Sequence, residues 1–274
     1  MDNIVRLWRL ADNTCAAVLK GHTSHVLTLA CTSDGVTLAS GSRDHTIRLW
    51  RLADSTCFAV LMGHTSHVLA LAFTSDGATL ASGSGDNTVR LWRLADNTCT
   101  AILKGHTDLV RALACTPDGA TLASGSRDTT VRLWRLADNT CTAVLEGHTD
   151  YVLAVAFTPD GGTLASGSGD TTVRLWRLAD YTCTAVLPGH TNSVRALACT
   201  HDGVTLASGS RDNTVRLWRL VDNTCTAVLK GHTEEVNALT CTPDGGTLAS
   251  GSSDSTVLLW RLADKPKVCI PGWA

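Results

Sequence analysis

One residue sets the period of this chain: tryptophan recurs every 42 positions along almost its whole length. The seven periodic tryptophans are Trp8, Trp50, Trp92, Trp134, Trp176, Trp218 and Trp260. A Gly-His pair recurs six times with the same spacing. Such a period is typical of a repeat array or a propeller, because one unit alone is too small to bury its own apolar faces. The chain is therefore predicted to consist of copies of one structural unit.

The unit is clearest in residues 148–176, HTDYVLAVAFTPDGGTLASGSGDTTVRLW. Its three apolar runs, VLAVAF, TLASGS and TTVRLW, are separated by the turn sequences TPDGG and GD. Proline suits the first corner of a turn, glycine suits positive φ, and β-branched and aromatic residues favour strands. A fourth run, CTAVL, lies at residues 141–145, after the preceding tryptophan. The pattern predicts four short strands in every 42 residues.

The repeats cover nearly all of the 274 residues. Six complete meanders extend from residue 21 to residue 260, whereas residues 1–19 contain only NIVRLW and CAAVL, the last two strands of a unit. The final fourth strand is degenerate, because KPKVCI at 265–270 replaces the usual sequence and Pro266 removes a backbone donor. No linker, charge block or low-complexity segment interrupts the array. Residues 1–274 are therefore predicted to form a single domain.

Composition argues against several classes of function. The net charge is −2 and the charges are spread evenly, which argues against a protein built to bind nucleic acid or an acidic membrane surface. Hydrophobic residues make up 44% of the chain, enough for the core of one large all-β domain. The first twenty residues carry charges throughout, so neither a signal peptide nor a membrane-spanning segment is expected.

The cysteines follow the repeat. Six occupy the same place in the fourth strand: Cys15, Cys57, Cys99, Cys141, Cys183 and Cys225. Four more end the first strand: Cys31, Cys115, Cys199 and Cys241. The other two repeats have Phe73 and Phe157 there, which predicts an apolar, buried position. Because no CxxC-like spacing occurs, no disulfide framework or metal site is expected. Buried, reduced thiols predict a reducing, intracellular compartment, the cytoplasm.

The repeated pattern GH…V..LA.T.DG.TLASGS.D.TVRLW resembles that of the WD-repeat β-propeller family over nearly the whole chain. The resemblance implies an all-β propeller of four-stranded antiparallel blades, with the first strand of each blade lining a central channel. One departure is that every periodic tryptophan is followed by arginine, where the family's name dipeptide has aspartate. The fold prediction does not depend on that aspartate, which the family often replaces.

The strand count allows two rings. Six repeats are complete and the N-terminal one is a half repeat. The predicted arrangement is a seven-position ring with an incomplete blade. The alternative is a closed six-bladed ring in which CAAVL completes the last sheet in place of KPKVCI. An incomplete blade would expose a strand edge, which makes self-association a possible property of the chain.

A histidine, a serine, an aspartate and a tryptophan recur in each complete repeat, as in His148, Ser166, Asp170 and Trp176. The resemblance assigns them to an internal hydrogen-bond network, and a catalytic set repeated six times would be unusual. The predicted network residues are His22, Asp44, Trp50, His64, Asp86, Trp92, His106, Asp128, Trp134, His148, Asp170, Trp176, His190, Asp212, Trp218, His232, Asp254 and Trp260.

The repeats differ in a few columns, and function on a repeat scaffold is expected where repeats differ. By resemblance these columns face the narrow top surface around the channel, where the family commonly binds peptides. The candidate binding residues there are Arg43, Arg111, Arg127, Arg195, Arg211, His25, His67 and Tyr151. Arginine forks suit carboxylate or phosphate groups, and aromatic side chains suit anchoring. The predicted partner is therefore a protein or peptide, with acidic or phosphorylated segments preferred.

The sequence thus favours a non-catalytic scaffold or adaptor for protein–protein interaction in signalling, with no cofactor. A first alternative is a sensor or recognition module of a multi-component signalling or defence receptor, a use found among relatives with near-identical blades. The chain itself contains no GxxxxGK[ST] nucleotide-binding sequence. A second alternative is a propeller enzyme, for which the only non-periodic candidates are Glu234, Glu235 and His201.

Overall fold

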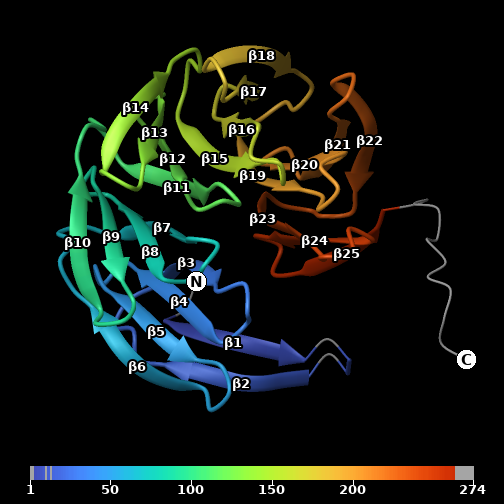
Figure 1. The fold of residues 1–274 in the computed structure, drawn as a ribbon. Coiled ribbons are helices and arrows are strands. Elements are labelled where there is room, and N and C mark those ends of the chain that lie inside the picture. The colour runs from blue at the N-terminus through green and yellow to red at the C-terminus, as the bar shows by residue number, and fades with distance from the viewer. Residues whose placement is uncertain (1–2, 10, 13, 263–274) are drawn as a thin grey trace, which may run out of the picture.

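The computed structural model describes residues 3–9, 11–12 and 14–262, which form 25 β-strands and, within those ranges, no helix (Figure 1). The N-terminal sheet contains β1 (Ile4–Arg9) and β2 (Thr14–Lys20). The first three blades contain β3 (Val26–Cys31), β4 (Thr37–Ser42), β5 (Ile47–Arg51) and β6 (Thr56–Leu61); β7 (Val68–Phe73), β8 (Thr79–Ser84), β9 (Val89–Arg93) and β10 (Thr98–Leu103); and β11 (Val110–Cys115), β12 (Thr121–Ser126), β13 (Val131–Arg135) and β14 (Thr140–Leu145).

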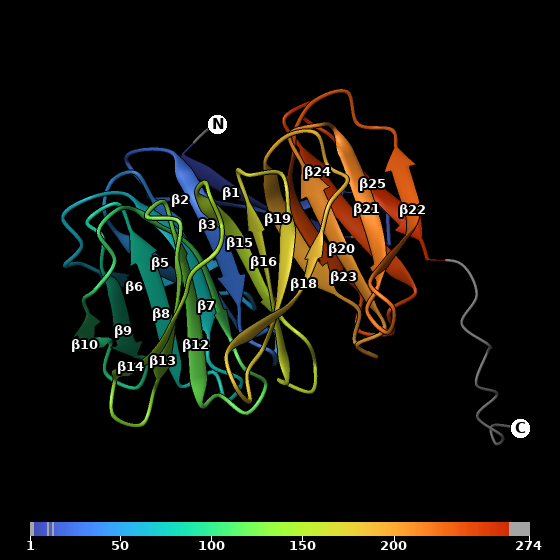
Figure 2. The same cartoon turned by 90° about the horizontal axis from the view of Figure 1, so that it is seen from above.

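The next two blades contain β15 (Val152–Phe157), β16 (Thr163–Ser168), β17 (Val173–Arg177) and β18 (Thr182–Leu187); and β19 (Val194–Cys199), β20 (Thr205–Ser210), β21 (Thr214–Arg219) and β22 (Thr224–Lys230). The sixth contains β23 (Val236–Cys241), β24 (Thr247–Ser252) and β25 (Val257–Arg261). Neighbouring strands pair antiparallel in chain order, and the blades stand around a central channel with the first strand innermost (Figures 1 and 2). The predicted all-β propeller of four-stranded antiparallel blades is confirmed.

The turns follow from the residues placed in them. In the fourth blade, Gly161 has φ of 70°, as the predicted turn between β15 and β16 requires. The tighter turn between β16 and β17 places Thr171 at φ of 69°, an uncommon conformation for a β-branched residue. Asp170 stabilises this turn, because its Oδ1 accepts hydrogen bonds from both the backbone N–H and the hydroxyl of Thr172.

The core lies between blades. Val131 and Leu133 of β13 are buried against Val152 and Leu164 of the following blade, and equivalent clusters recur around the ring. The contact is so close that a Cβ added to Gly125 would lie 2.7 Å from Val152 Cγ1. Each of the first five blades is therefore covered by the next one, and its second strand needs a glycine where the next first strand crosses it.

The two ends of the array differ from its middle. The strands β1 and β2 pair with each other as a separate sheet, and Val5 and Leu19 of this sheet pack against Trp50 of the first blade. Closing a six-bladed ring with CAAVL would require β2 to pair with β25, whereas within the described ranges β2 pairs with β1 and β25 is the last strand of its sheet. The predicted degenerate strand at 265–270 lies outside the described residues.

The prediction that the cysteines are buried is wrong. Five of the six fourth-strand cysteines are exposed and Cys57 is half-buried, because the fourth strand is the outer rim of each blade and its residues alternate toward solvent. At the end of the first strands, Cys31 is exposed and the other three are half-buried. Burial and nearby aspartates raise the pKa of the Cys115 and Cys199 thiols to about 11, so these two stay protonated at neutral pH.

Candidate functional site

The recurrent polar residues meet in every complete repeat. Histidine Nδ1 lies 2.7–2.8 Å from the turn aspartate, and histidine Nε2 lies 2.7–2.8 Å from the second-strand serine. The tryptophan Nε1–H donates to the same serine over 2.8 Å in all six. Each network therefore connects the loop before the first strand to the second and third strands of one blade.

The network has one consistent direction in the fourth blade. The indole of Trp176 donates to Ser166, the hydroxyl of Ser166 donates to Nε2 of His148, and Nδ1–H of His148 donates to Asp170. A neutral histidine with its proton on Nδ1 satisfies all of these contacts. The backbone N–H of Thr149 also donates to Asp170. Ser166 is fully buried, and its hydroxyl is hydrogen-bonded to both His148 and Trp176, so it is not available as a nucleophile.

The network makes stability depend on pH. Burial raises the pKa of Asp170, but the hydrogen bonds from His148 and Thr172 outweigh it and hold that pKa far below its usual range. The equivalent aspartates shift in the same direction. Burial lowers the pKa of His190 below its usual 6.5, despite the opposing contact with Asp212. Both kinds of shift mean that the unfolded chain binds more protons than the folded one in acid.

We therefore expect the melting temperature to fall as the pH is lowered. The His190 contribution is fully present above about pH 6.5 and is lost below it, and the aspartate contributions are fully present above about pH 4 and are lost below it. Calorimetric scans from pH 8 to pH 3 measure the effect. A melting temperature that stays constant down to pH 3 would contradict the proposed protonation states.

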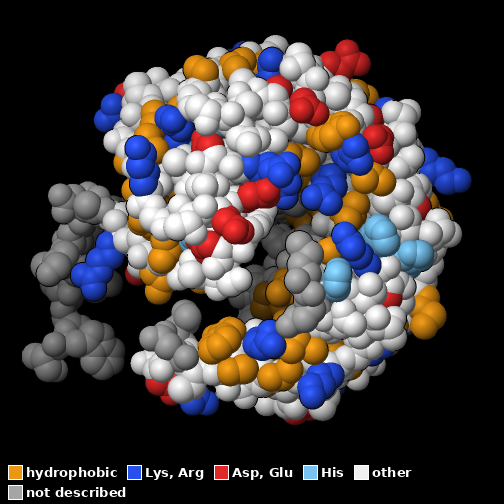
Figure 3. Space-filling model, turned by 180° about the vertical axis from the view of Figure 1, so that it is seen from behind, with side chains coloured by type: hydrophobic (Ala, Val, Ile, Leu, Met, Phe, Trp, Pro, Cys, Tyr) orange, Lys and Arg blue, Asp and Glu red, His pale blue; other side chains and the backbone are white. Residues whose placement is uncertain are grey.

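The candidate binding residues gather around one end of the channel. This end, here called the top face, carries the tight turns between second and third strands, in which Arg43, Arg127 and Arg211 lie. Basic side chains surround the central opening on this face (Figure 3). Five candidates line a pocket of about 400 Å³ formed by the third, fourth and fifth blades: Arg111, Arg127, Tyr151, Arg195 and Arg211. Arg43 and His67 line the central cavity of about 880 Å³ together with Arg111 and Arg195. His25 lines neither and contributes its backbone carbonyl to the N–H of Arg43.

Arg127 and Tyr151 form one unit across two blades. The guanidinium lies 4.1 Å from the centre of the Tyr151 ring, and its Nη2 donates to the tyrosine hydroxyl over 2.7 Å. These contacts raise the pKa of Arg127. The cation–π contact fixes an aromatic surface beside the pocket.

Sequence reasoning missed the acidic residues on this face: Asp150 lines the pocket, and Glu235 pairs with two of its arginines. Glu235, at the loop before β23, lies 2.8 Å from Arg211 Nη2 and 3.3 Å from Arg195 Nε. Arg195 also donates to Asn237 over 3.2 Å. Glu235 stands in one of the variable columns, so the signal was present, but the sequence does not show that the fifth and sixth blades bring it to these two arginines.

Arg111 is different from its neighbours. It lines both the pocket and the central cavity, and it makes no ion pair or hydrogen bond with any residue that the structure describes. Burial, with the nearby charges of Arg195 and Arg127, lowers its pKa. A cation that is half-buried among like charges is favourable for an arriving anion, because that anion would relieve both the burial cost and the repulsion.

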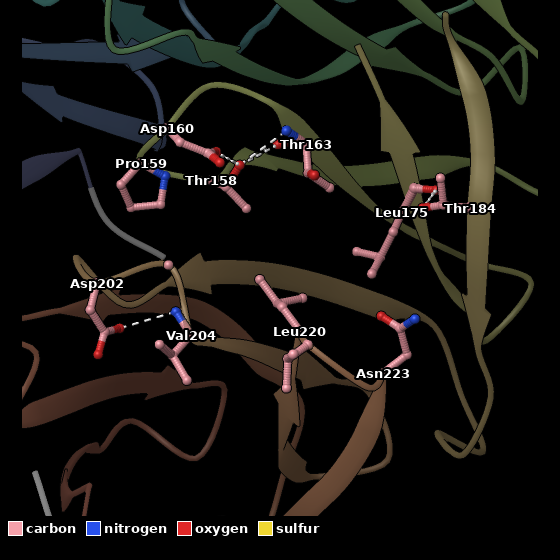
Figure 4. Close-up of a pocket in the computed structure, with 12 residues that line it drawn as sticks. Thr158, Pro159, Asp160, Thr163, Leu175, Thr184, Asp202, Val204, Leu220 and Asn223 are labelled. Atoms are coloured by element: carbon pink, nitrogen blue, oxygen red, sulfur yellow. Dashed lines mark hydrogen bonds between the residues drawn. The ribbon is translucent and has the colours of Figure 1, made fainter. Parts of the chain in front are cut away.

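A second pocket, of about 440 Å³, lies on the opposite face between the fourth and fifth blades (Figure 4). Its polar groups serve the turns themselves: Thr158 donates to Asp160, and the Val204 N–H donates to Asp202. The residues that line the pocket include no basic side chain. It is the weaker candidate for a charged ligand.

The arginines that follow the periodic tryptophans form a separate group at the rim. Arg177 Nη2 lies 2.6 Å from Asp180, and five other such arginines pair with an aspartate three residues later. Both partners are about half exposed, and such surface pairs stabilise a protein by about 0–1 kcal/mol. Unlike Arg111, each of these six arginines therefore already has an acidic partner.

The repeats match one known family. The profile of the family described as "WD domain, G-beta repeat" matches residues 13–51, 55–93, 97–135, 139–177, 181–219 and 223–261. The chain belongs to the WD40 family. Each match begins at the fourth strand of one blade and ends at the third strand of the next, so the WD40 repeat is offset from the blade. No curated protein matches this WD40 chain.

Two further findings concern the described part of the WD40 propeller. Within it, there is no cluster of three or more His, Cys, Asp or Glu side chains that could hold a metal ion. The same part of the chain contains no helix of sufficient length and apolar character to cross a membrane. WD40 propellers are generally non-catalytic and typically bind proteins or peptides.

Proposed function

We propose that this chain is a non-catalytic scaffold that binds an acidic or phosphorylated peptide on its top face. The observation that carries the proposal is the half-buried Arg111 at the mouth of the channel, which pairs with no acidic side chain of the described residues. The WD40 family supports the general class, since its propellers serve as platforms for protein partners. The preference for an anionic segment comes from this chain's own arginines.

The pocket offers such a segment two different kinds of contact. Arg111 supplies a fork for a carboxylate or phosphate, and the Tyr151 ring, held by Arg127, supplies an apolar surface beside it. Arg195 and Arg211 lie on the far side, where Glu235 already neutralises part of their charge. An anionic group is therefore expected to bind most strongly at Arg111, on the first strand of the third blade.

Degenerate peptide libraries with a fixed central phosphoserine, glutamate or alanine test the preference. We expect the purified chain to retain the phosphoserine and glutamate libraries and to release the alanine library. Binding should weaken as salt is raised, because the contacts are partly exposed to solvent. Equal retention of all three libraries would contradict a site that selects negative charge.

The variant with Arg111→Glu and Arg195→Glu tests the residues. We expect the dissociation constant of a retained peptide to rise about 100-fold or more, because two charge-assisted hydrogen bonds worth about 1.5–3 kcal/mol each are replaced by repulsion. Fluorescence anisotropy with the labelled peptide measures the change.

The variant with Arg135→Glu and Arg177→Glu is the matched control. It makes the same change in net charge, but at exposed rim arginines that pair with aspartates. We expect its affinity to stay within about threefold of the parent chain, which is the range of a distant, screened charge change. If both variants lose binding equally, overall charge and not the pocket determines affinity.

A further inference from the structure

Three tight turns on the top face carry an arginine, and the next blade contacts each of them. The contacting residue always lies just before the first strand of that blade. The three pairs are Arg43 with His67, Arg127 with Tyr151, and Arg211 with Glu235. Of the three contacting residues, Glu235 alone is acidic. At this place the chain therefore supplies its own anion to the top face.

The Glu235 carboxylate bridges two arginines of the pocket. Its Oε1 lies 2.8 Å from Nη2 of Arg211, and its Oε2 lies 3.3 Å from Nε of Arg195. The second contact is imperfect, because the N–H at Nε of Arg195 is buried and has no hydrogen-bond partner among the residues that the structure describes. A buried N–H without an acceptor is unfavourable, so an anion that accepted from both nitrogens would bind here better than Glu235 does.

An equivalent pair of arginines shows that the fold does not require this carboxylate. Arg111 and Arg127 stand two repeats before Arg195 and Arg211. There Tyr151 stands in place of the glutamate, and it holds Arg127 by a hydrogen bond and a cation–π contact. All four arginines line the same pocket. The pocket thus contains one anion site at Arg111, which pairs with no acidic side chain of the described residues, and a second that the internal carboxylate occupies.

The internal carboxylate is placed where a ligand can displace it. The exposed fractions of the side chains are 28% for Arg195, 43% for Arg211 and 27% for Glu235, so an arriving ligand reaches all three. Ion pairs that solvent reaches contribute little to folding. Burial lowers the pKa of Arg195, the charge of Glu235 opposes that shift, and the charge of Arg211 adds to it. The two arginines therefore favour an anion, but the fold does not depend on Glu235 to supply it.

We propose that Arg195 and Arg211 form a second anion subsite of the top-face pocket, which Glu235 occupies until a phosphate group of the partner displaces it. A carboxylate that replaces Glu235 exchanges like for like and gains little. A phosphate carries a charge of about −1.5 to −2 and three acceptor oxygens, enough to accept from Arg195 Nε and Arg211 Nη2 together. The subsite extends the proposed function and rests on it, since the partner then carries a phosphate here besides the anionic group expected at Arg111.

Degenerate peptide libraries test which group displaces Glu235. Each library has phosphoserine at a first fixed position and alanine, glutamate or phosphoserine at a second position shortly after it. For the parent chain, we expect the glutamate libraries to bind within about threefold of the alanine libraries. The best doubly phosphorylated library should bind about tenfold more tightly than these, the effect of one added charge-assisted hydrogen bond. Fluorescence anisotropy measures the dissociation constants.

The Glu235→Gln chain tests the residue. Glutamine keeps the size of the side chain, and the backbone carbonyl at this position still accepts the N–H of Ser253. Without the internal carboxylate, the glutamate libraries should also bind about tenfold more tightly than the alanine libraries. Glu234→Gln is the matched control, because it removes the same charge from the preceding, exposed residue, whose backbone carbonyl accepts from Ser252. We expect this control to rank the libraries as the parent chain does.

Inorganic phosphate probes the subsite without any peptide. We expect calorimetry to give a dissociation constant for the Glu235→Gln chain about tenfold below that of the parent, and one for Glu234→Gln within about threefold of the parent. Adding Arg211→Gln to the Glu235→Gln chain should restore the parent value, because the gain acts through that arginine. Thermal unfolding checks that every variant is folded.

Two results would overturn the subsite. Equal gains for the two glutamine variants would mean that net charge alone determines affinity. No gain for Glu235→Gln with either probe would mean that Glu235 does not compete with the ligand, and the proposed function would still hold if the parent chain retains the singly phosphorylated libraries. Conversely, a gain in phosphate binding by Glu235→Gln with no library retained by the parent chain would contradict the proposed function and support the subsite.

Discussion

Replacing Asp170 with alanine is expected to lower the free energy of unfolding of the fourth blade by about 3–5 kcal/mol. The change leaves the Nδ1–H of His148 and the N–H groups of Thr149 and Thr172 without their acceptor, in a place where little water reaches them. Thermal unfolding, with hydrogen exchange of residues 148–177 to locate the loss, measures the effect.

The change of Asp180 to alanine is the matched control in the same repeat. Asp180 pairs with the exposed Arg177 and accepts bonds from Thr182 in a surface turn. We expect a loss of about 1 kcal/mol or less, because solvent replaces the contacts. If the two variants unfold alike, the network around His148 does not stabilise the blade.

The second large effect is expected for Trp134→Ala, which should cost about 3–5 kcal/mol. The Trp134 side chain is buried between two blades, beside Ala81, Val89 and Leu91, and its removal leaves a cavity and deletes the hydrogen bond to Ser124. The same change at Trp8 should cost less than about 1 kcal/mol, because that ring is mostly in solvent.

Denaturant titration of the two tryptophan variants measures the difference. Both remove the same atoms from the same column of the repeat, so intrinsic strand preference cancels. A large loss for Trp8→Ala would mean that Trp8 is covered in solution.

Much of the fold could be predicted from sequence because every local signal is given six times. The strand pattern, the Asp-Gly turns and the position of Gly125 all follow from one unit, and the structure repeats them with nearly constant geometry. The polar set of His148, Ser166 and Asp170 also has a constant spacing, and the structure brings these residues into contact. Periodicity predicts what is common to all blades.

The top face was harder to predict because its contacts join residues from different repeats. The pairing of Glu235 with Arg211, and the stacking of Arg127 on Tyr151, depend on how far neighbouring blades rotate, which one repeat does not encode. The burial of the cysteines was predicted wrongly for another reason. Replacement of Cys by Phe indicates apolar character, but a half-covered rim or channel opening accepts either residue.

The offset between the WD40 repeat and the blade has a consequence for how such chains change length. The matched segment 139–177 supplies β14 to one blade and β15, β16 and β17 to the next. An exchange between two near-identical repeats would therefore remove or add a whole module without leaving any blade short of a strand. Only the circumference of the ring would change, and the open seam between β25 and β1 is where that change would be absorbed.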